Sequence, residues 1–299
     1  AEKFIVAGMG GSHLAADLVK VWNPSFPVLV HMNYSLPAMP EEDLLSHLLI
    51  VSSYSGNTEE TLSAYYEARE KRLAVAVIST DGELLRQAQK DKIPYIQLPD
   101  TGIQPRSALG FSLKALFALM GRQDIVKELA GIGRSLQILG AGAFEEEGKR
   151  LAESIAGYIP LIYSSQRNYP IAYNWKIKFN ETGKIPAFCN FFPELNHNEM
   201  AGFDFTEKSK SLSEKFFFIF LQDADDDLDI QKRMKVLADI LRQRGFMVVA
   251  RELEGVNVFH KIFASLILAD WTAYYTALNY GADPEQVPMV EEFKIKIRE

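Results

Sequence analysis

The first third of the chain alternates short apolar runs with stretches of helical spacing, and this pattern most limits what it can fold into. β-rich runs predict strands over residues 3–8, 26–31, 48–54, 74–80 and 93–98. Between these runs, residues 12–22 and 57–72 have apolar side chains at helical spacing. Apolar strands separated by helices are typical of a doubly wound parallel sheet, which binds ligands beyond the carboxyl ends of its strands.

The same pattern restarts in the second half of the chain. We expect strands over residues 158–165, 185–192, 215–222 and 246–254, and helices over residues 169–181, 228–245 and 258–281. Glycine-marked stretches near residues 120–140 separate the two halves. The sequence therefore predicts an α/β fold with two domains, over residues 1–125 and 126–280, and a C-terminal segment over residues 281–299.

Composition excludes several classes of protein. The 299 residues carry a net charge of −7, which argues against nonspecific nucleic-acid binding. Cys189 is the only cysteine, so no disulfide forms within the chain, and its apolar neighbours predict a buried, inert thiol. No apolar run approaches the roughly 20 residues that span a membrane. We expect a cytoplasmic protein with neither a nucleic-acid nor a membrane partner.

A hydroxyl-rich stretch, "SSYSGNTEET" (residues 52–61), follows the third predicted strand. Asn57 or Thr58 is a good N-cap for the helix that begins there, and Gly56 lets the backbone approach a ligand closely. A helix start with hydroxyl donors at Ser53, Ser55 and Thr58 suits a phosphate monoester. An ordinary capped helix after a strand is the structural alternative.

Two further patterns narrow the choice of ligand. "GMGGS" (residues 8–12) follows the first strand, but His13 stands where a dinucleotide fingerprint needs its third glycine, and no GxxxxGK[ST] element occurs. A phosphorylated small molecule therefore fits better than NAD or ATP. The acidic stretch from residue 223 lacks the glycine and glutamate of a calcium loop, with Leu228 and Met234 in their places. We interpret it as the negatively charged start of a helix.

"GMGGS" together with "SYSGNTEET" resembles the sugar isomerase (SIS) domain, a flavodoxin-like fold that binds sugar phosphates. Downstream, "PRSAL", "NETGK", "ELNHNE" and "DPEQVPMVEEFK" resemble, in that order, the archaeal-type bifunctional phosphoglucose/phosphomannose isomerases. The resemblance covers essentially the whole chain. It implies two SIS-type domains and an aldose–ketose isomerase acting on glucose 6-phosphate and fructose 6-phosphate.

The resemblance also implies a role for each matching residue. Such an isomerase moves a proton between C1 and C2 through a cis-enediol(ate) and needs a carboxylate base, a cation and ring-opening groups. Glu181 resembles the base, Arg106 the residue that stabilises the enediolate, and Lys294 a ring-opening lysine. His197, flanked by two amides that could orient its ring, resembles a ring-opening histidine that the partner subunit contributes in a homodimer.

The remaining implied residues bind the substrate. The phosphate is expected on Ser53, Ser55 and Thr58, while Gly11 and Ser12 contact the sugar or phosphate. These groups fill every role without a metal ion or an organic cofactor, so we expect none.

Two alternative functions and one question about the substrate stay open at this point. A non-catalytic SIS-type sugar-phosphate-binding regulator would bind the same ligand without turnover, although no appended DNA-binding helix-turn-helix is found. An amino-sugar or pentose-phosphate isomerase is a second alternative, but those relatives do not carry "ELNHNE". The family often has Thr-Pro where this chain has Val287 and Pro288, which removes a hydroxyl near C1 and C2. The sequence therefore leaves the use of mannose 6-phosphate open.

Overall fold

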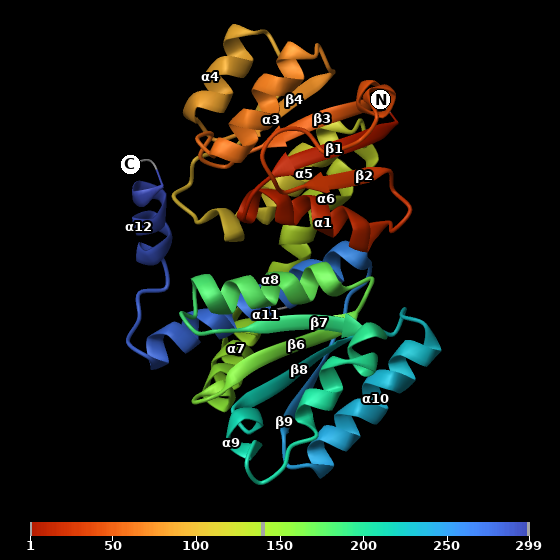
Figure 1. Ribbon diagram of the computed structural model, residues 1–299, viewed down its shortest axis with the longest axis vertical. Helices are drawn as coiled ribbons and strands as arrows, with labels where there is room; N and C mark the ends of the chain where they lie inside the picture. Colours follow the sequence, from red (N-terminus) through yellow and green to blue (C-terminus); the bar gives the residue numbers. More distant parts are fainter. Residues whose placement is uncertain (1, 139–140, 298–299) are drawn as a thin grey trace. The chain divides into compact units, whose positions relative to one another are not determined.

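The computed structural model describes residues 2–138 and 141–297. By its internal contacts the chain divides into two compact units, Ala1–Ser135 and Leu136–Glu299, which we call unit 1 and unit 2 (Figure 1). Each unit has its own parallel sheet and its own helices, so each is described by itself.

Unit 1 is built on a parallel sheet with the strand order β2-β1-β3-β4-β5. Its strands are β1 Lys3–Gly8, β2 Val28–His31, β3 His47–Ser52, β4 Val75–Ser79 and β5 Tyr95–Gln97. Its helices are α1 Gly11–Trp22, α2 Glu41–Ser46, α3 Glu59–Glu70, α4 Gly82–Lys90, the 3₁₀ turn η1 Pro105–Ser107, α5 Leu109–Leu119 and α6 Gln123–Ile138.

Helices cover both faces of this sheet because its central strands are apolar on both sides. All five residues of β4 are buried, as are the last five of β1. Val51 and Val77 pack with Tyr65 of α3 and Leu84 of α4 in one core. Helix α1 packs against α5, while α3 and α4 lie beside β3 and β4. The doubly wound parallel sheet predicted for this half is confirmed.

Unit 2 repeats this plan with the parallel strand order β7-β6-β8-β9. Its strands are β6 Ile159–Ser165, β7 Phe188–Phe192, β8 Phe216–Gln222 and β9 Met247–Glu252. Its helices and 3₁₀ turns are α7 Ala141–Ile155, α8 Tyr169–Glu181, η2 Glu194–His197, η3 Glu199–Phe203, α9 Lys210–Ser213, α10 Leu228–Gln243, α11 Val258–Asn279 and α12 Pro288–Lys296.

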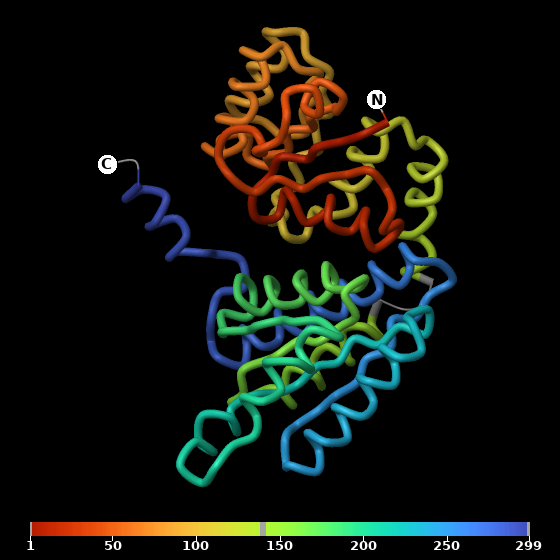
Figure 2. The backbone as a smooth tube through the Cα atoms, turned by 45° about the vertical axis from the view of Figure 1, so that its right-hand side comes forward, coloured from red at the N-terminus to blue at the C-terminus, as the bar shows by residue number. Residues whose placement is uncertain are grey.

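The helices of unit 2 also lie on both sides of their sheet. Helix α8 contacts β6 and β7 and packs against α11, which in turn packs along α7. Helix α10 contacts β8 and β9 on the opposite side, as the traces in Figures 1 and 2 show. Aromatic rings from β8 and the segment before α9, including Phe218 and Phe203, fill the core under α10.

The strand order places one switch point in each sheet. In unit 1 the chain passes from β1 outward to β2 and then returns to β3 on the other side of β1. In unit 2 it passes from β6 to β7 and returns to β8 in the same way. Ligands of doubly wound sheets bind at the carboxyl ends of the two strands that flank this reversal. The loops after β1 and β3, and after β6 and β8, are therefore the places to look for a site.

The predicted strands are all present, and their ends differ from the predicted ones by up to three residues. The glycine-marked stretches between the halves are largely helical, since α6 and α7 cover residues 123–138 and 141–155. Among the residues described, no helix combines the length and the apolar character that crossing a bilayer requires.

Candidate active site

The loop after β3 gathers hydroxyl groups at the switch point of unit 1. Ser53 is fully buried, and its Oγ accepts the Gly56 N–H at 3.1 Å and lies 2.9 Å from Thr58 Oγ1. Ser55, two residues on, is exposed and accepts the Asn57 N–H at 3.3 Å. The hydroxyls of Ser53 and Thr58 therefore form a pair inside the loop, and that of Ser55 lies at its surface.

Thr58 occupies the N-cap position of α3, one of the two positions that the sequence predicts. Its side chain makes no capping hydrogen bond and contacts Ser53 instead. A helix start that its N-cap side chain leaves open, next to several hydroxyls, is a favourable place for an anionic phosphate.

The turn between β1 and α1 lies against this loop. Ser12 Oγ accepts the Tyr54 N–H at 2.9 Å, which ties the first residues of α1 to the hydroxyl loop. A Cβ at Gly11 would lie 2.8 Å from the carbonyl carbon of Pro105 and 2.9 Å from the Arg106 nitrogen. Only glycine lets η1 approach α1 this closely.

Arg106 thereby comes to the same edge of unit 1. It is the central residue of η1, which Pro105 begins, and it is 4% exposed. The structure thus brings together the sequence-predicted binding residues of this unit, Gly11, Ser12, Ser53, Ser55 and Thr58, with the backbone of Arg106 beside them.

In unit 2 Glu181 is the last residue of α8 and is half-buried. The Lys184 ammonium donates to the backbone carbonyl of Glu181. A cation at this position complements the negative end of the α8 dipole. The turn that follows α8 is therefore fixed through the Glu181 backbone.

His197 ends the 3₁₀ turn η2 and is exposed. The amides on either side of it have other partners: Asn198 Nδ2 donates to Glu194 Oε1 at 2.7 Å, and Asn196 Nδ2 lies 3.7 Å from Met200 Sδ. These two contacts shape the turn, and the orientation of the imidazole by the flanking amides stays a prediction.

Glu199 is a positioning residue that the sequence interpretation did not single out. Its carboxylate accepts the Tyr163 hydroxyl of β6 at 2.6 Å and the Asn190 side-chain amide of β7. Burial, and then the Glu199 charge, raise the pKa of Tyr163, so the phenol stays a donor. Through these two contacts Glu199 holds the turn that carries His197 against the sheet. In the sequence, its place at the end of "ELNHNE" is the feature that could have identified it.

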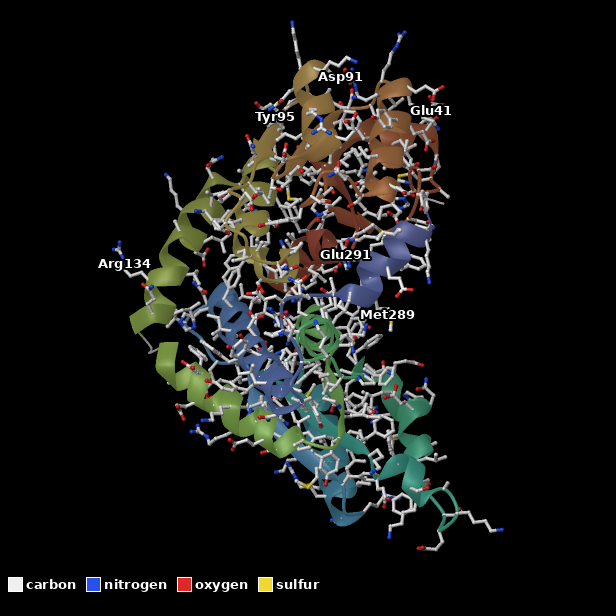
Figure 3. The ribbon with its side chains drawn as sticks, turned by 90° about the vertical axis from the view of Figure 1, so that its left-hand side faces the viewer. Glu41, Asp91, Tyr95, Arg134, Met289 and Glu291 are labelled. Atoms are coloured by element: carbon white, nitrogen blue, oxygen red, sulfur yellow. The ribbon has the colours of Figure 1, made fainter. Side chains whose placement is uncertain are left out.

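Lys294 lies on α12 and is exposed, with its Nζ 2.8 Å from Glu291 Oε1. No residue of α12 is buried, and Met289, labelled with Glu291 in Figure 3, is 82% exposed. Val287 is the N-cap of this helix and makes no side-chain capping bond. Within unit 2, Glu181, His197 and Lys294 thus lie on three separate elements.

The switch point of unit 2 is filled by a network of polar side chains. Asn168 Nδ2 donates to Asp223 Oδ2 at 3.1 Å and to Asp226 Oδ1 at 3.3 Å, and Ser165 Oγ donates to Asp226 at 2.7 Å. Lys261 Nζ lies 2.6 Å from Asp223 Oδ1. These side chains are therefore hydrogen-bonded to one another.

The acidic stretch that supplies these aspartates begins α10, as predicted. Asp227 is the N-cap, and its side chain accepts the Asp229 N–H at 2.8 Å. Over residues 2–138 and 141–297, no group of three or more His, Cys, Asp or Glu side chains is placed to hold a metal ion.

Cys189 differs from its prediction as a buried hydrophobe. It lies on β7, at the edge of the sheet, and is half-buried, with Sγ 3.6 Å from the Tyr169 hydroxyl. Burial raises the pKa of this thiol, which keeps it protonated and unreactive.

Similarity to known proteins extends over both units of the chain. Residues 144–297 match the family model described as the bacterial phospho-glucose isomerase C-terminal SIS domain. The bifunctional phosphoglucose/phosphomannose isomerase of Caldicellulosiruptor bescii is 33% identical over 100% of this chain and 90% of its own length. The enzyme of the same name from Aquifex aeolicus is 31% identical over 98% of this chain and 90% of its own length.

Among solved structures, the tagatose-6-phosphate ketose/aldose isomerase of Escherichia coli superposes with a TM-score of 0.67 at 17% identity. The match covers 94% of this chain and 83% of that one. At this identity the likeness supports the fold alone, which is that of two SIS-type domains. With full-length identity above 30% to named members, the chain belongs to the family of bifunctional phosphoglucose/phosphomannose isomerases.

Proposed function

We propose that this protein is a cofactor-independent aldose–ketose isomerase that interconverts glucose 6-phosphate, fructose 6-phosphate and mannose 6-phosphate. The observation that carries the proposal is the match to two enzymes of that name along nearly the whole chain, including both units. A hydroxyl-lined helix start at the switch point of unit 1 supplies the site that such substrates need.

We call residues 53–58 the phosphate loop. The phosphate is held by Ser53, Ser55 and Thr58, with the start of α3 complementing its charge. Gly11 and Ser12 contact the ligand from the β1–α1 turn. That turn is close enough, because Ser12 is hydrogen-bonded to the backbone of the phosphate loop.

The chemistry is a proton transfer. His197 and Lys294 open the sugar ring by moving a proton between the ring oxygen and the C1 hydroxyl. The Glu181 carboxylate removes the proton from C2 of the open-chain aldose, which leaves a cis-enediolate with its charge on O1. A proton then passes from the C2 hydroxyl to O1, and Glu181 returns its proton to C1, so that C2 becomes the carbonyl of the ketose. Arg106 stabilises the negative charge of the enediolate oxygen. C1 is reduced while C2 is oxidised within the same molecule, so these steps require no external oxidant or reductant and no metal ion.

The protein acts as a homodimer in which each subunit donates His197 to the site of its partner. The resemblance of "ELNHNE" to the family supports this assignment, and so does the exposed position of His197 on η2. The single half-buried cysteine is consistent with a reducing cytoplasm.

A coupled assay with glucose 6-phosphate and mannose 6-phosphate as separate substrates tests the proposal. Glu181→Gln removes the base while keeping the size of the side chain, so kcat should fall by about 10²–10⁴-fold. Glu214→Gln, a change at an exposed glutamate after α9, is the matched control and should keep the wild-type rate.

Two results would overturn parts of this proposal. Near wild-type turnover by Glu181→Gln would show that another group is the base. Binding of fructose 6-phosphate by the wild type without any turnover would favour the non-catalytic sugar-phosphate regulator. Turnover of glucose 6-phosphate alone would attribute the lost mannose activity to Val287 in place of threonine.

A further inference from the structure

We propose that Gly82, at the start of α4, is a positioning residue that holds the phosphate loop in its binding conformation. The inference rests on the proposed function, since it assigns Gly82 to the site that binds the sugar phosphate. Gly82 acts through the backbone of residues 55 and 56.

Two glycines with left-handed backbones interlock between the phosphate loop and the turn before α4. Gly56 has φ +69°, and a Cβ there would lie 1.8 Å from the Asp81 carbonyl oxygen. Gly82 has φ +87°, and a Cβ there would lie 2.2 Å from the Ser55 carbonyl oxygen. Both obstacles are backbone atoms, so a side chain at either position must push the two segments apart.

Hydrogen bonds also join the phosphate loop to the first turn of α4. The Leu84 N–H donates to the Gly56 carbonyl at 2.9 Å, and the Glu83 N–H donates to Asn57 Oδ1 at 3.0 Å. Asp81, the N-cap of α4, makes no side-chain capping bond. The first turn of α4 is therefore capped by the phosphate loop itself, from 26 residues earlier in the chain.

A second pair of contacts fixes the loop just before this point. The Thr80 N–H and Thr80 hydroxyl both donate to the Tyr54 carbonyl, at 3.0 Å and 2.5 Å. The backbone N–H of Tyr54 donates to the Ser12 hydroxyl at 2.9 Å. Ser55, the exposed ligand of the loop, follows directly. Its orientation therefore depends on the close approach that Gly82 allows.

Gly82→Ala tests this role without changing any residue of the phosphate loop. The added methyl displaces Ser55, so the KM for glucose 6-phosphate should rise about tenfold, as expected for weakening a hydrogen bond to an anionic ligand. The kcat should stay within about twofold, because the lost binding is uniform and Glu181 lies in unit 2. The inhibition constant of inorganic phosphate should rise by the same factor as the KM.

Gly121→Ala is the matched control. Gly121 also has a left-handed backbone, with φ +74°, but a Cβ there meets no atom within 4 Å. Gly121→Ala therefore places alanine in a left-handed backbone conformation, as Gly82→Ala does, but does not affect the phosphate loop. It should leave the KM and the inhibition constant of phosphate unchanged. Equal values for the two variants would overturn the proposal. So would a fall in kcat at constant KM in Gly82→Ala.

Asn57→Ala keeps the proposal testable if Gly82→Ala does not fold. It removes the acceptor of the Glu83 N–H and also the side-chain amide that donates to the Ser55 carbonyl at 3.2 Å, so the KM should rise about threefold, with an unchanged KM as the contrary result. Calorimetric titration with inorganic phosphate separates this inference from the proposed function. If the wild type shows no isomerase turnover, weaker phosphate binding by Gly82→Ala than by Gly121→Ala still supports the positioning role.

Discussion

Two aspartates at the switch point of unit 2 have pKa values shifted in opposite directions. Burial acts on both, but the Lys261 ammonium and neighbouring N–H donors hold the pKa of Asp223 below its ordinary value of 3.8. Burial, with the charge of Asp223, raises the pKa of Asp226. Asp223 therefore stabilises the fold in its charged form, and Asp226 in its protonated form.

Lys261→Met should lower the free energy of unfolding by about 3 kcal/mol at pH 7, because it leaves Asp223 buried without its cation. Asp223 is 4% exposed, so little solvent screening reduces the effect. Urea unfolding measures the difference, with Lys235→Met, at an exposed lysine of α10, as the control that should change little.

The same variant should show a defined pH dependence. Because the folded pKa of Asp223 is depressed, the pair stabilises the protein above pH 3.8 and loses its effect as the pH falls through the folded value. The folded pKa of Lys261 is raised above 10.5. At alkaline pH the stabilisation is therefore lost only as the pH rises through this raised pKa. The wild type and Lys261→Met should converge once the pH has fallen below the lowered pKa of Asp223. A constant difference would assign the effect to packing of the lysine chain.

At the scale of single elements, two glycines of α7 have opposite surroundings. A Cβ at Gly148 would lie 2.5 Å from Trp271 Cβ and 2.9 Å from the Thr272 nitrogen of α11. A Cβ at Gly142 would meet no atom within 4 Å. Gly148 therefore sets the close approach of α7 to α11, while Gly142 only weakens the helix.

Alanine at these two positions should have effects of opposite sign. Gly142→Ala should stabilise the protein by about 0.5–1 kcal/mol through helix propensity. Gly148→Ala gains the same propensity but overpacks the α7–α11 contact, at a cost of about 1–3 kcal/mol, so it should destabilise. Thermal unfolding of the two variants checks the prediction, and stabilisation by both would mean that α7 and α11 are loosely packed.

Strands were easier to predict than helices because buried parallel strands have an unmistakable composition. The runs at β3 and β4 are almost wholly apolar and end in polar residues, so their limits were nearly right. Helices α6 and α7 were not recognised, since their glycines suggest a linker when the sequence is considered alone. The close approach at Gly148 is a property of packing, and local sequence does not encode it.

In the candidate site, too, features set by neighbouring residues could be predicted from the sequence, and contacts between distant residues could not. Ser55 and Thr58 could be predicted, because a hydroxyl loop before a helix is a local pattern. The capping of α4 by Asn57 could not, since it joins residues 26 apart that only the order of β3 and β4 makes neighbours. Glu199 was overlooked for a related reason, because its partners lie on β6 and β7.

At the scale of the whole molecule, the phosphate loop belongs to unit 1 and the proposed acid–base groups belong to unit 2. The terminal helix α12 is the extreme case, since none of its residues is buried. Its contribution to the stability of unit 2 is therefore small, and the role proposed for α12 is to carry Lys294.

Lys294→Ala should lower the isomerase kcat at least tenfold while leaving the melting temperature within about 2 °C of the wild type, because an exposed lysine contributes little to stability. Lys296→Ala is a matched control, since Lys296 is paired within α12 in a similar way, to Glu292 at 2.5 Å. Equal rates for the two variants would remove Lys294 from the ring-opening step.

The paired network at the switch point of unit 2 has a consequence for stoichiometry. Both sheets reverse their strand order at equivalent places, but the second place is lined by Asp223 and Asp226, which repel an anion, and is closed by their own hydrogen bonds. For the residues that the structure describes, we therefore expect one sugar-phosphate site per chain, at the switch point of unit 1. Saturation with such a ligand should end at one molecule per chain, with an isotherm that has no second phase.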